Sequence, residues 1–328
     1  MVFMKFKVNS YHFKLLRDYE RLSAFKEAID DYAKSRLEKN ELSDESDESD
    51  ESNDNSAIAK NNKTLAFDLG CGSGVLSYFA QTYMDEIVAI ESNNSTYQLA
   101  KENLKEFDNI QVYHGDILSF DFSKLNDNAD LIICEMLDTA LIDEEEVPVL
   151  NYAKNYLKDD GAIIPQAIIN SAEPIFMNNH FIQYEDDEYN PIYVVLGEST
   201  IYSEFDFLDD IDCNFEAELE LKTYDLENLE KNNFEEKISS EKFESFNFRD
   251  NFNIKENKLK INGIKLTSFT KLNENIICGP TPMLNPSILV PIEETELNCG
   301  DSLRIRLEYV MGGGVETIKT EVLDVVNF

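Results

Sequence analysis

Hydrophobic and polar positions in the first half of the chain follow two periods. Residues Tyr11–Leu37 carry apolar side chains at a spacing close to 3.6 residues, which predicts a helix. From Thr64 onward, short apolar runs that predict buried strands alternate with segments that predict helices. The expected strands include Glu86–Ile90, Ile110–His114, Asp130–Cys134 and Gly161–Ile164, and the expected helices Val75–Thr82, Ser95–Phe107 and Glu144–Leu157. This α/β alternation predicts a doubly wound parallel sheet.

The pattern changes after Pro165. Short segments of alternating polarity follow, separated by polar turns, and they predict an antiparallel β domain built as a barrel or sandwich. The expected strands are Ala167–Pro174, Ile192–Leu196, Cys213–Leu221, Lys258–Phe269, Ser287–Val290, Ser302–Tyr309 and Glu316–Val326. We find no clear helix at 201–211, and a weak helical pattern at 226–237.

An acidic repeat separates the first helical segment from the α/β part. Residues Ser43–Ser52 repeat Ser-Asp-Glu triplets without an apolar side chain. Such a segment cannot bury enough apolar surface to offset its ordering entropy, so we expect residues 38–62 to form a disordered linker or insert. The expected domains are therefore residues 1–37, 63–165 and 166–328, with this insert between the first two.

The chain is strongly acidic, with a net charge of −36 over 328 residues. The phosphates of a nucleic acid would be repelled, whereas a basic protein segment would be attracted. Solubility in a salty cytoplasm explains the charge equally well. No apolar run is long enough to span a membrane, and Met1–Ser10 has no secretory core, so we expect a cytoplasmic protein. Five scattered cysteines favour reduced thiols over a metal site.

A glycine-rich turn follows the first strand of the α/β part. Asp68 precedes Gly70, Gly72 and Gly74, which stand at alternate positions before the helix at 75–82. Glycine allows close approach of a ligand to the backbone, and the helix N-terminus offers free N–H groups. The spacing differs from the G-x-G-x-x-G fingerprint of dinucleotide-binding proteins.

Three more acids fall at the carboxyl ends of the expected strands, which is where ligands bind in such sheets. Glu91 lies 23 residues after Asp68 and could accept both hydroxyls of a ribose. Asp116 could accept a hydrogen bond from an adenine amine. Together with the glycine turn, these acids predict an adenosyl cofactor. Glu135 ends the fourth strand, and Glu144 follows nine residues later. A pair of carboxylates matches the N–H donors of a guanidinium, although acids such as Glu144 are also common at helix N-termini.

These motifs resemble those of class I S-adenosylmethionine-dependent methyltransferases, and the pair Glu135 and Glu144 resembles the double-E loop of protein arginine methyltransferases. The resemblance implies a Rossmann-like domain followed by a β-barrel-like substrate domain, with S-adenosyl-L-methionine as cofactor. It implies that Glu135 and Glu144 hold an arginine guanidinium of a protein or peptide. It also implies that Arg21, spaced from His12 and Asp18 as in the family, pairs with the cofactor carboxylate while the N-terminal helices close over the site.

The chain departs from this family at two places. Val2 and Phe6 replace a pair of tyrosines, and Thr281-Pro282-Met283 stands where the family has Thr-His-Trp; the chain contains no Trp. Two alternatives therefore stay open. The acceptor could be another protein residue or a cationic small molecule, or the chain could be a non-catalytic cofactor-binding subunit. A homodimer also stays open.

Overall fold

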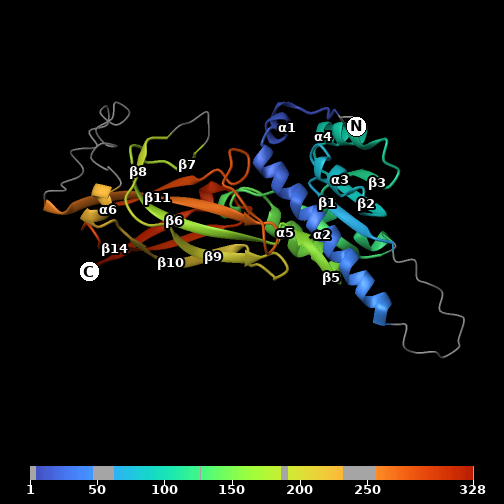
Figure 1. The fold of residues 1–328 in the computed structure, drawn as a ribbon. Helices are drawn as coiled ribbons and strands as arrows, with labels where there is room; N and C mark the ends of the chain where they lie inside the picture. The colour runs from blue at the N-terminus through green and yellow to red at the C-terminus, as the bar shows by residue number, and fades with distance from the viewer. Residues whose placement is uncertain (1–4, 47–62, 126, 186–190, 232–255, 328) are drawn as a thin grey trace, which may run out of the picture. The chain divides into compact units, whose positions relative to one another are not determined.

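A computed structural model describes residues 5–46, 63–125, 127–185, 191–231 and 256–327 (Figure 1). By their contacts the residues fall into two compact units. Unit 1 combines Met1–Met136, Pro148–Gln166 and Lys271–Cys278; unit 2 combines Leu137–Val147, Ala167–Thr270 and Gly279–Phe328. The chain thus passes between the units several times, and the loop after the fourth strand already belongs to unit 2.

Unit 1 contains the expected parallel sheet. Its strand order is β3-β2-β1-β4-β5, and all neighbours run parallel. The bounds are β1 Leu65–Leu69, β2 Glu86–Glu91, β3 Ile110–His114, β4 Ala129–Cys134 and β5 Leu157–Ile164. The α/β prediction is confirmed. The order reverses between β1 and β4, which is the point where such sheets open a crevice at their carboxyl ends.

The helices differ in detail from the predicted ones. They are α1 Ser10–Leu15, α2 Tyr19–Ser46, α3 Val75–Ala80, α4 Asn94–Leu104 and α5 Glu146–Ala153. The expected helix at 11–37 is broken, because Asp18 accepts a hydrogen bond from the Arg21 N–H and begins α2 anew. Helix α2 also continues to Ser46, so the first residues of the expected linker are helical. The part of the acidic insert at 47–62 lies outside the described residues.

The core of unit 1 reflects the continuous apolar runs in its sequence. Every residue of β1 and of β4 is buried, as a strand covered on both faces requires. Phe25, Ala28 and Ile29 of α2 are almost inaccessible, which places one face of this helix in the core. Among the described residues, no helix has the length and apolar composition needed to cross a membrane.

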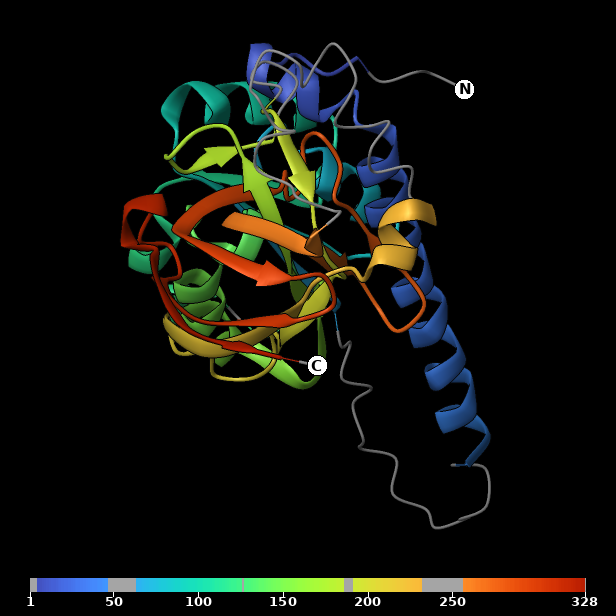
Figure 2. The same ribbon diagram turned by 90° about the vertical axis from the view of Figure 1, so that its left-hand side faces the viewer.

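Unit 2 is built of antiparallel strands, as the alternating pattern predicts (Figure 2). One sheet contains the path β7-β13-β11-β6-β8, with β9 paired to β6, and a second has the order β10-β14-β15. The bounds are β6 Ala167–Met177, β7 Gln183–Tyr184, β8 Tyr193–Val195, β9 Thr200–Asp206, β10 Asn214–Lys222, β11 Lys258–Lys271, β13 Ile288–Asn298, β14 Ser302–Val310 and β15 Lys319–Val326, with the short helix α6 at Leu226–Lys231 and, in unit 1, β12 at Ile277–Cys278. The segment considered for a helix at 201–211 is mostly strand β9, and residues 232–237 lie outside the described ones.

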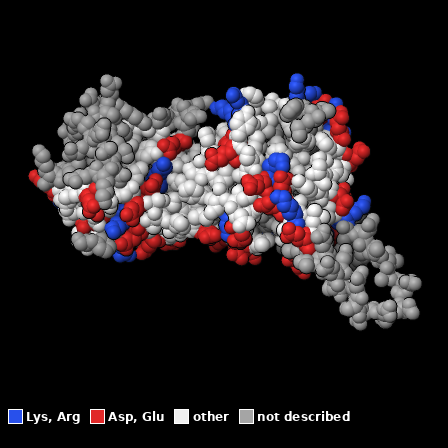
Figure 3. All heavy atoms as spheres, viewed as in Figure 1, with Lys and Arg blue, Asp and Glu red and all other residues white. Residues whose placement is uncertain are grey.

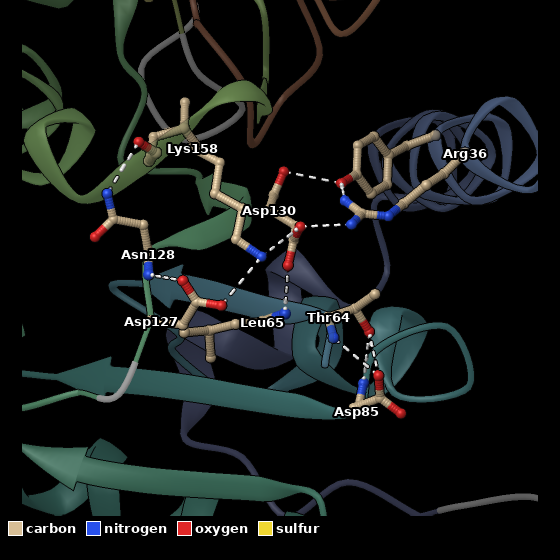
Figure 4. A network of polar contacts seen from close by, with 10 residues as sticks. Arg36, Thr64, Leu65, Asp85, Asp127, Asn128, Asp130 and Lys158 are labelled. Carbon is tan, nitrogen blue, oxygen red and sulfur yellow. Dashed lines mark hydrogen bonds and ion pairs between the residues drawn. The ribbon is translucent and has the colours of Figure 1, made fainter. Parts of the chain in front are cut away.

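A buried carboxylate ties three elements of unit 1 together (Figure 4). Asp130, at the start of β4, is fully buried, and its Oδ1 lies 2.5 Å from Arg36 Nη2 and 2.9 Å from Lys158 Nζ. Its Oδ2 accepts a hydrogen bond of 2.7 Å from the Leu65 N–H. The carboxylate therefore neutralises cations from α2 and β5 while it pairs with the first residue of β1.

Replacing this carboxylate should destabilise unit 1. We expect Asp130→Asn to lower the free energy of unfolding by about 3 kcal/mol, because both cations lose their buried partner. The control is Asp127→Asn, which removes an acid about half exposed and 3.4 Å from the same Lys158, and should cost less than about 1 kcal/mol. Urea unfolding followed by circular dichroism measures both; equal effects would contradict the assignment.

Candidate functional site

The glycine turn after β1 adopts a backbone that glycine alone adopts readily. Gly70, Gly72 and Gly74 have φ values of 69°, 53° and 82°. A Cβ on Gly70 would stand 2.7 Å from the Met136 sulfur, and one on Gly72 would stand 2.9 Å from His12 Nε2. Sequence reasoning explained the glycines by ligand approach; in the structure, positive φ and the packing of the chain's own side chains also require them.

Asp68 fixes the junction between the turn and α3. Its carboxylate is buried, and Oδ2 accepts hydrogen bonds from the Ser77 N–H at 2.9 Å and the Ser77 hydroxyl at 2.5 Å. Burial raises the pKa of Asp68 to about 6; the Ser77 bonds oppose this rise, and the nearby charges of Glu135 and Glu91 add to it. Three predicted site acids therefore interact at the carboxyl ends of adjacent strands β1, β2 and β4.

Glu91, at the end of β2, is buried and holds two backbone groups. Its Oε2 accepts from the Gly72 N–H at 3.0 Å, and its Oε1 accepts from the Asn93 N–H at 2.7 Å. The glycine turn and the loop after β2 are thus joined through this side chain. Each carboxylate oxygen has a second lone pair, which could accept a hydrogen bond from a hydroxyl group of a ligand.

Asp116 has a more local role than the sequence suggested. Its exposed side chain caps a single 3₁₀ turn at Ile117–Ser119, accepting from the Leu118 N–H and the Ser119 hydroxyl. Asp116 does follow β3, as expected, but its carboxylate is engaged by its own turn.

Arg21 and Glu135 form a buried fork. Arg21 Nε lies 3.1 Å from Glu135 Oε1, and Arg21 Nη2 donates to Oε2; the side chains are 3% and 12% exposed. Sequence reasoning assigned Arg21 to a cofactor carboxylate, and here its first partner is Glu135. The third donor, Arg21 Nη1, is buried and has no hydrogen-bond partner among the described residues. A buried donor of this kind calls for an acceptor, and it fits an acidic ligand group.

His12 closes the same region from α1. Its Nδ1 lies 2.9 Å from Asn9 Oδ1, and its Nε2 faces Gly72. Burial lowers the pKa of His12, although the charges of Glu91 and Glu135 oppose this change. The structure thus brings together Arg21, Asp68, Glu91, Glu135 and the glycine turn within unit 1.

Glu144 belongs to unit 2, in the loop that precedes α5. Its side chain is exposed, and its N–H donates to Asp138 Oδ1 at 3.2 Å. Thr281 of the Thr-Pro-Met segment is also in unit 2, where its N–H donates to the Leu284 carbonyl in a tight turn.

Sequence reasoning missed three supporting side chains. Ser77 holds Asp68, and Asp138 holds Glu144. Asn103 of α4 donates to the carbonyls of Ser73 and Lys7, which fastens the N-terminal segment beside the glycine turn. Asp138 stood in a segment already singled out, so an acid between the two glutamates was a usable signal; Ser77 and Asn103 gave none. Among the described residues, no group of His, Cys, Asp and Glu side chains could hold a metal ion.

Comparison with known proteins gives consistent matches. The family model described as "Methyltransferase domain" matches residues 60–207. An uncharacterized protein of Methanothermobacter thermautotrophicus is 36% identical over 98% of this chain and 100% of its own length. A ribosomal protein L11 methyltransferase of Thermosipho africanus is 28% identical over 39% of this chain and 46% of its own. Among solved structures, a Trypanosoma brucei PRMT1 enzyme–prozyme heterotetrameric complex with AdoHcy has a TM-score of 0.63 at 14% identity, covering 97% of this chain and 100% of the other.

The raised pKa of Asp68 predicts a pH-dependent stability. An unfolded Asp titrates near 3.9 and the folded one near 6, so the folded state binds more protons between these values and stability falls as pH rises through them. We expect the free energy of unfolding of Asp68→Asn, relative to wild type, to increase by about 1.4 kcal/mol between pH 5 and pH 7.5.

Urea unfolding at each pH measures this difference. The control is Asp85→Asn. Hydrogen bonds from the Thr64 N–H and hydroxyl lower the pKa of Asp85, so the stability that this carboxylate contributes is lost only in more acidic solution. The difference in the free energy of unfolding between Asp85→Asn and wild type should therefore stay constant from pH 5 to pH 7.5. If the difference between Asp68→Asn and wild type also stayed constant over this pH range, the raised pKa of Asp68 would be refuted.

Proposed function

We propose that this chain, a class I S-adenosylmethionine-dependent methyltransferase whose residues 60–207 match a methyltransferase domain, methylates an arginine side chain of a protein. S-Adenosyl-L-methionine is the cofactor. When bound, it supplies an activated methyl group on a sulfonium sulfur. The chain's own residues bind the two reactants, orient them and complement the charge that changes.

The buried Arg21 Nη1 is the single observation that carries the cofactor assignment to particular residues. A guanidinium N–H in that position would donate to the cofactor carboxylate, while Nε and Nη2 stay on Glu135. Glu91 would accept the ribose hydroxyls with its remaining lone pairs, and Asp116 or its backbone would accept the adenine amine. Asp68 accepts two hydrogen bonds from Ser77, and these fix the start of α3 directly after the glycine turn.

The acceptor assignment rests on Glu135 and Glu144, which stand nine residues apart. Two carboxylates can bind the N–H donors of one guanidinium and draw its positive charge away from the remaining nitrogen. That nitrogen then keeps a lone pair for attack on the methyl group. The fork between Arg21 and Glu135 supports this role, since Glu135 already accepts one guanidinium with both oxygens and retains further lone pairs.

The acidity of the chain supports a basic protein segment as substrate. A net charge of −36 attracts cationic partners over long range. The solved structure named above is titled as a PRMT1 complex, which favours arginine. That complex is a heterotetramer; for this chain a homodimer stays a proposal, and light scattering after size exclusion would test it.

A second candidate changes only the acceptor. The relative from Thermosipho africanus is named a ribosomal protein L11 methyltransferase, and this chain has Pro282 and Met283 where arginine methyltransferases have His and Trp. Another residue of a protein, or a cationic small molecule, is therefore the alternative acceptor.

Mass spectrometry distinguishes the candidates. The purified chain is incubated with methyl-labelled cofactor and a lysate fraction of basic proteins, and the labelled residues are identified. Methylarginine supports the proposal, and label on any other acceptor supports the second candidate. Tight cofactor binding without transfer to any acceptor would indicate a non-catalytic subunit.

Replacing the second acid should abolish transfer and spare the cofactor site. We expect Glu144→Gln to lower kcat/KM for an arginine peptide about a hundredfold, because a neutral amide loses a charge-assisted hydrogen bond worth about 3 kcal/mol. Calorimetry should show unchanged cofactor affinity. Glu145→Gln is the matched control, since it makes the same change at the next exposed residue. Full activity of Glu144→Gln would remove Glu144 from the acceptor site.

Replacing Glu91, the acid that we propose to bind the ribose, should weaken cofactor binding. We expect Glu91→Gln to weaken cofactor binding about tenfold, which corresponds to about 1.4 kcal/mol for a charged hydrogen bond made neutral. Calorimetry measures the affinity, and Glu86→Gln at the half-buried start of the same strand is the control. Unchanged affinity would show that Glu91 only supports the loops.

A further inference from the structure

The loop from Asp138 to Glu144 holds an uncommon backbone. Ala140 and Leu141 have φ values of 60° and 61°, a left-handed conformation that costs energy in residues with a Cβ. Both side chains are fully buried. Strain of this kind persists only where surrounding contacts determine the conformation, and it gathers at sites that must be preformed.

Unit 2 supplies those contacts from several elements. The Ala140 N–H donates to the Ser268 hydroxyl of β11 at 2.8 Å, and this hydroxyl donates to Asn170 Oδ1 of β6 at 2.5 Å. The carbonyls of Leu141 and Ile142 each accept a hydrogen bond of 2.9 Å, from the N–H groups of the glycines at 312 and 314. The loop is therefore fixed along its length.

Asp138 closes the loop. Its Oδ2 accepts from the Asp143 N–H at 2.9 Å and its Oδ1 from the Glu144 N–H at 3.2 Å, so one carboxylate spans the loop from its first residue to its last. The side chain is only 7% exposed. The Tyr184 hydroxyl of β7 donates to the Asp143 carboxylate, and its oxygen also lies 3.4 Å from Asp138 Oδ2.

A carboxylate is a costly choice for this place. Burial raises the pKa of Asp138 to about 7, the two backbone bonds oppose this rise, and the charges of Asp143 and Glu144 add to it. A neutral side chain such as Asn could close the loop without placing a third acid beside those two. The carboxylate differs from Asn in that both of its oxygens accept and both bonds are strengthened by charge.

We propose that Asp138 is the positioning residue of Glu144: its buried carboxylate grips the Asp143 and Glu144 N–H groups and sets the second acid before any acceptor binds. This inference rests on the proposed role of Glu144 in holding the acceptor. Asp138 acts through the backbone of Glu144, and preorganisation of this kind lowers the barrier because no loop has to be ordered during the reaction.

Amide hydrogen exchange tests the grip without reference to any substrate. In the full-length protein, NMR should show protection factors of the Asp143 and Glu144 amides about tenfold lower in Asp138→Asn than in wild type, since one neutral oxygen replaces two charged ones. Amides of β4 should keep their protection, which shows an intact fold. Glu145→Gln is the matched control, and Asp138→Ser is the second variant if the Asn protein does not fold.

The pH dependence of the same amides separates a charged grip from a merely structural contact. The ionisable groups around Asp138 are Asp143 and Glu144 of its own loop, Tyr184 of β7 and Tyr309 of β14. In wild type, protection of the Glu144 amide should rise with pH through about 7 as Asp138 ionises; in Asp138→Asn it should be flat. Equal protection and equal pH profiles in both proteins overturn the proposal.

Kinetics with an arginine peptide then test whether the hydrogen bonds of Asp138 affect methyl transfer. We expect Asp138→Asn to lower kcat/KM for the peptide about tenfold or more, with the Kd for S-adenosylmethionine unchanged by calorimetry. Should wild type methylate no arginine peptide, the proposed acceptor is wrong, and the exchange experiment still decides whether Asp138 sets Glu144. Loss of amide protection without any change in transfer by an active enzyme overturns the positioning role.

Discussion

The fork between Arg21 and Glu135 is the contact on which the carboxyl edge of the parallel sheet in unit 1 depends. It connects α2 to the residue that follows β4, and both side chains are almost inaccessible. At the other end of the same strand, Arg36 of α2 binds Asp130. The two arginines are 15 residues apart, about 22 Å along a helix, and the two acids are five residues apart, about 17 Å along a strand. The stretch of α2 from Arg21 to Arg36 therefore lies along β4 in the opposite direction, with an ion pair at each end of that stretch.

This arrangement makes the helix and the acid interdependent. A guanidinium or a carboxylate left alone in such a place would cost several kcal/mol, so neither partner can leave without the other. Helix α2 is thus fixed against the end of β4, and burial of the apolar side chains of Phe25 and Ile29 adds to this attachment. Glu144 is fixed by different means. Its backbone N–H donates a hydrogen bond to the carboxylate of the buried Asp138.

The sequence predicted the parts of the fold that depend on local pattern. Strands β1 and β4 are buried along their whole length, and apart from one aspartate each they are apolar runs that can be recognised without a structure. The acids at the strand ends were equally readable, because the carboxyl edge of a parallel sheet is a fixed place. The break before α2 was missed, since it depends on one Asp side chain that bonds to the Arg21 N–H within an otherwise helical pattern.

The partners of the site residues could not be predicted, because they come from distant parts of the chain. Nothing near Asn170 or Ser268 indicates that they support Ala140, which lies 30 and 128 residues away. The left-handed Ala140 and Leu141 were also unpredictable, since glycine is the usual signal for that conformation. Local pattern therefore selected the candidate acids, and hydrogen bonds from distant parts of the chain hold the loop that carries one of them.

The distribution of charged side chains limits what the net charge of the chain can do. On the face seen in Figure 3, acidic side chains are spread out and basic ones lie beside many of them. In unit 2, Arg306 of β14 binds Glu218 of β10 and Glu321 of β15, so part of the acidity is neutralised across strands. Exposed charges are screened beyond about 8 Å at physiological salt, so the net charge speeds the approach of a cation but does not choose its binding place. Charges away from the surface are screened far less, and the pair of Arg21 and Glu135 is of this kind.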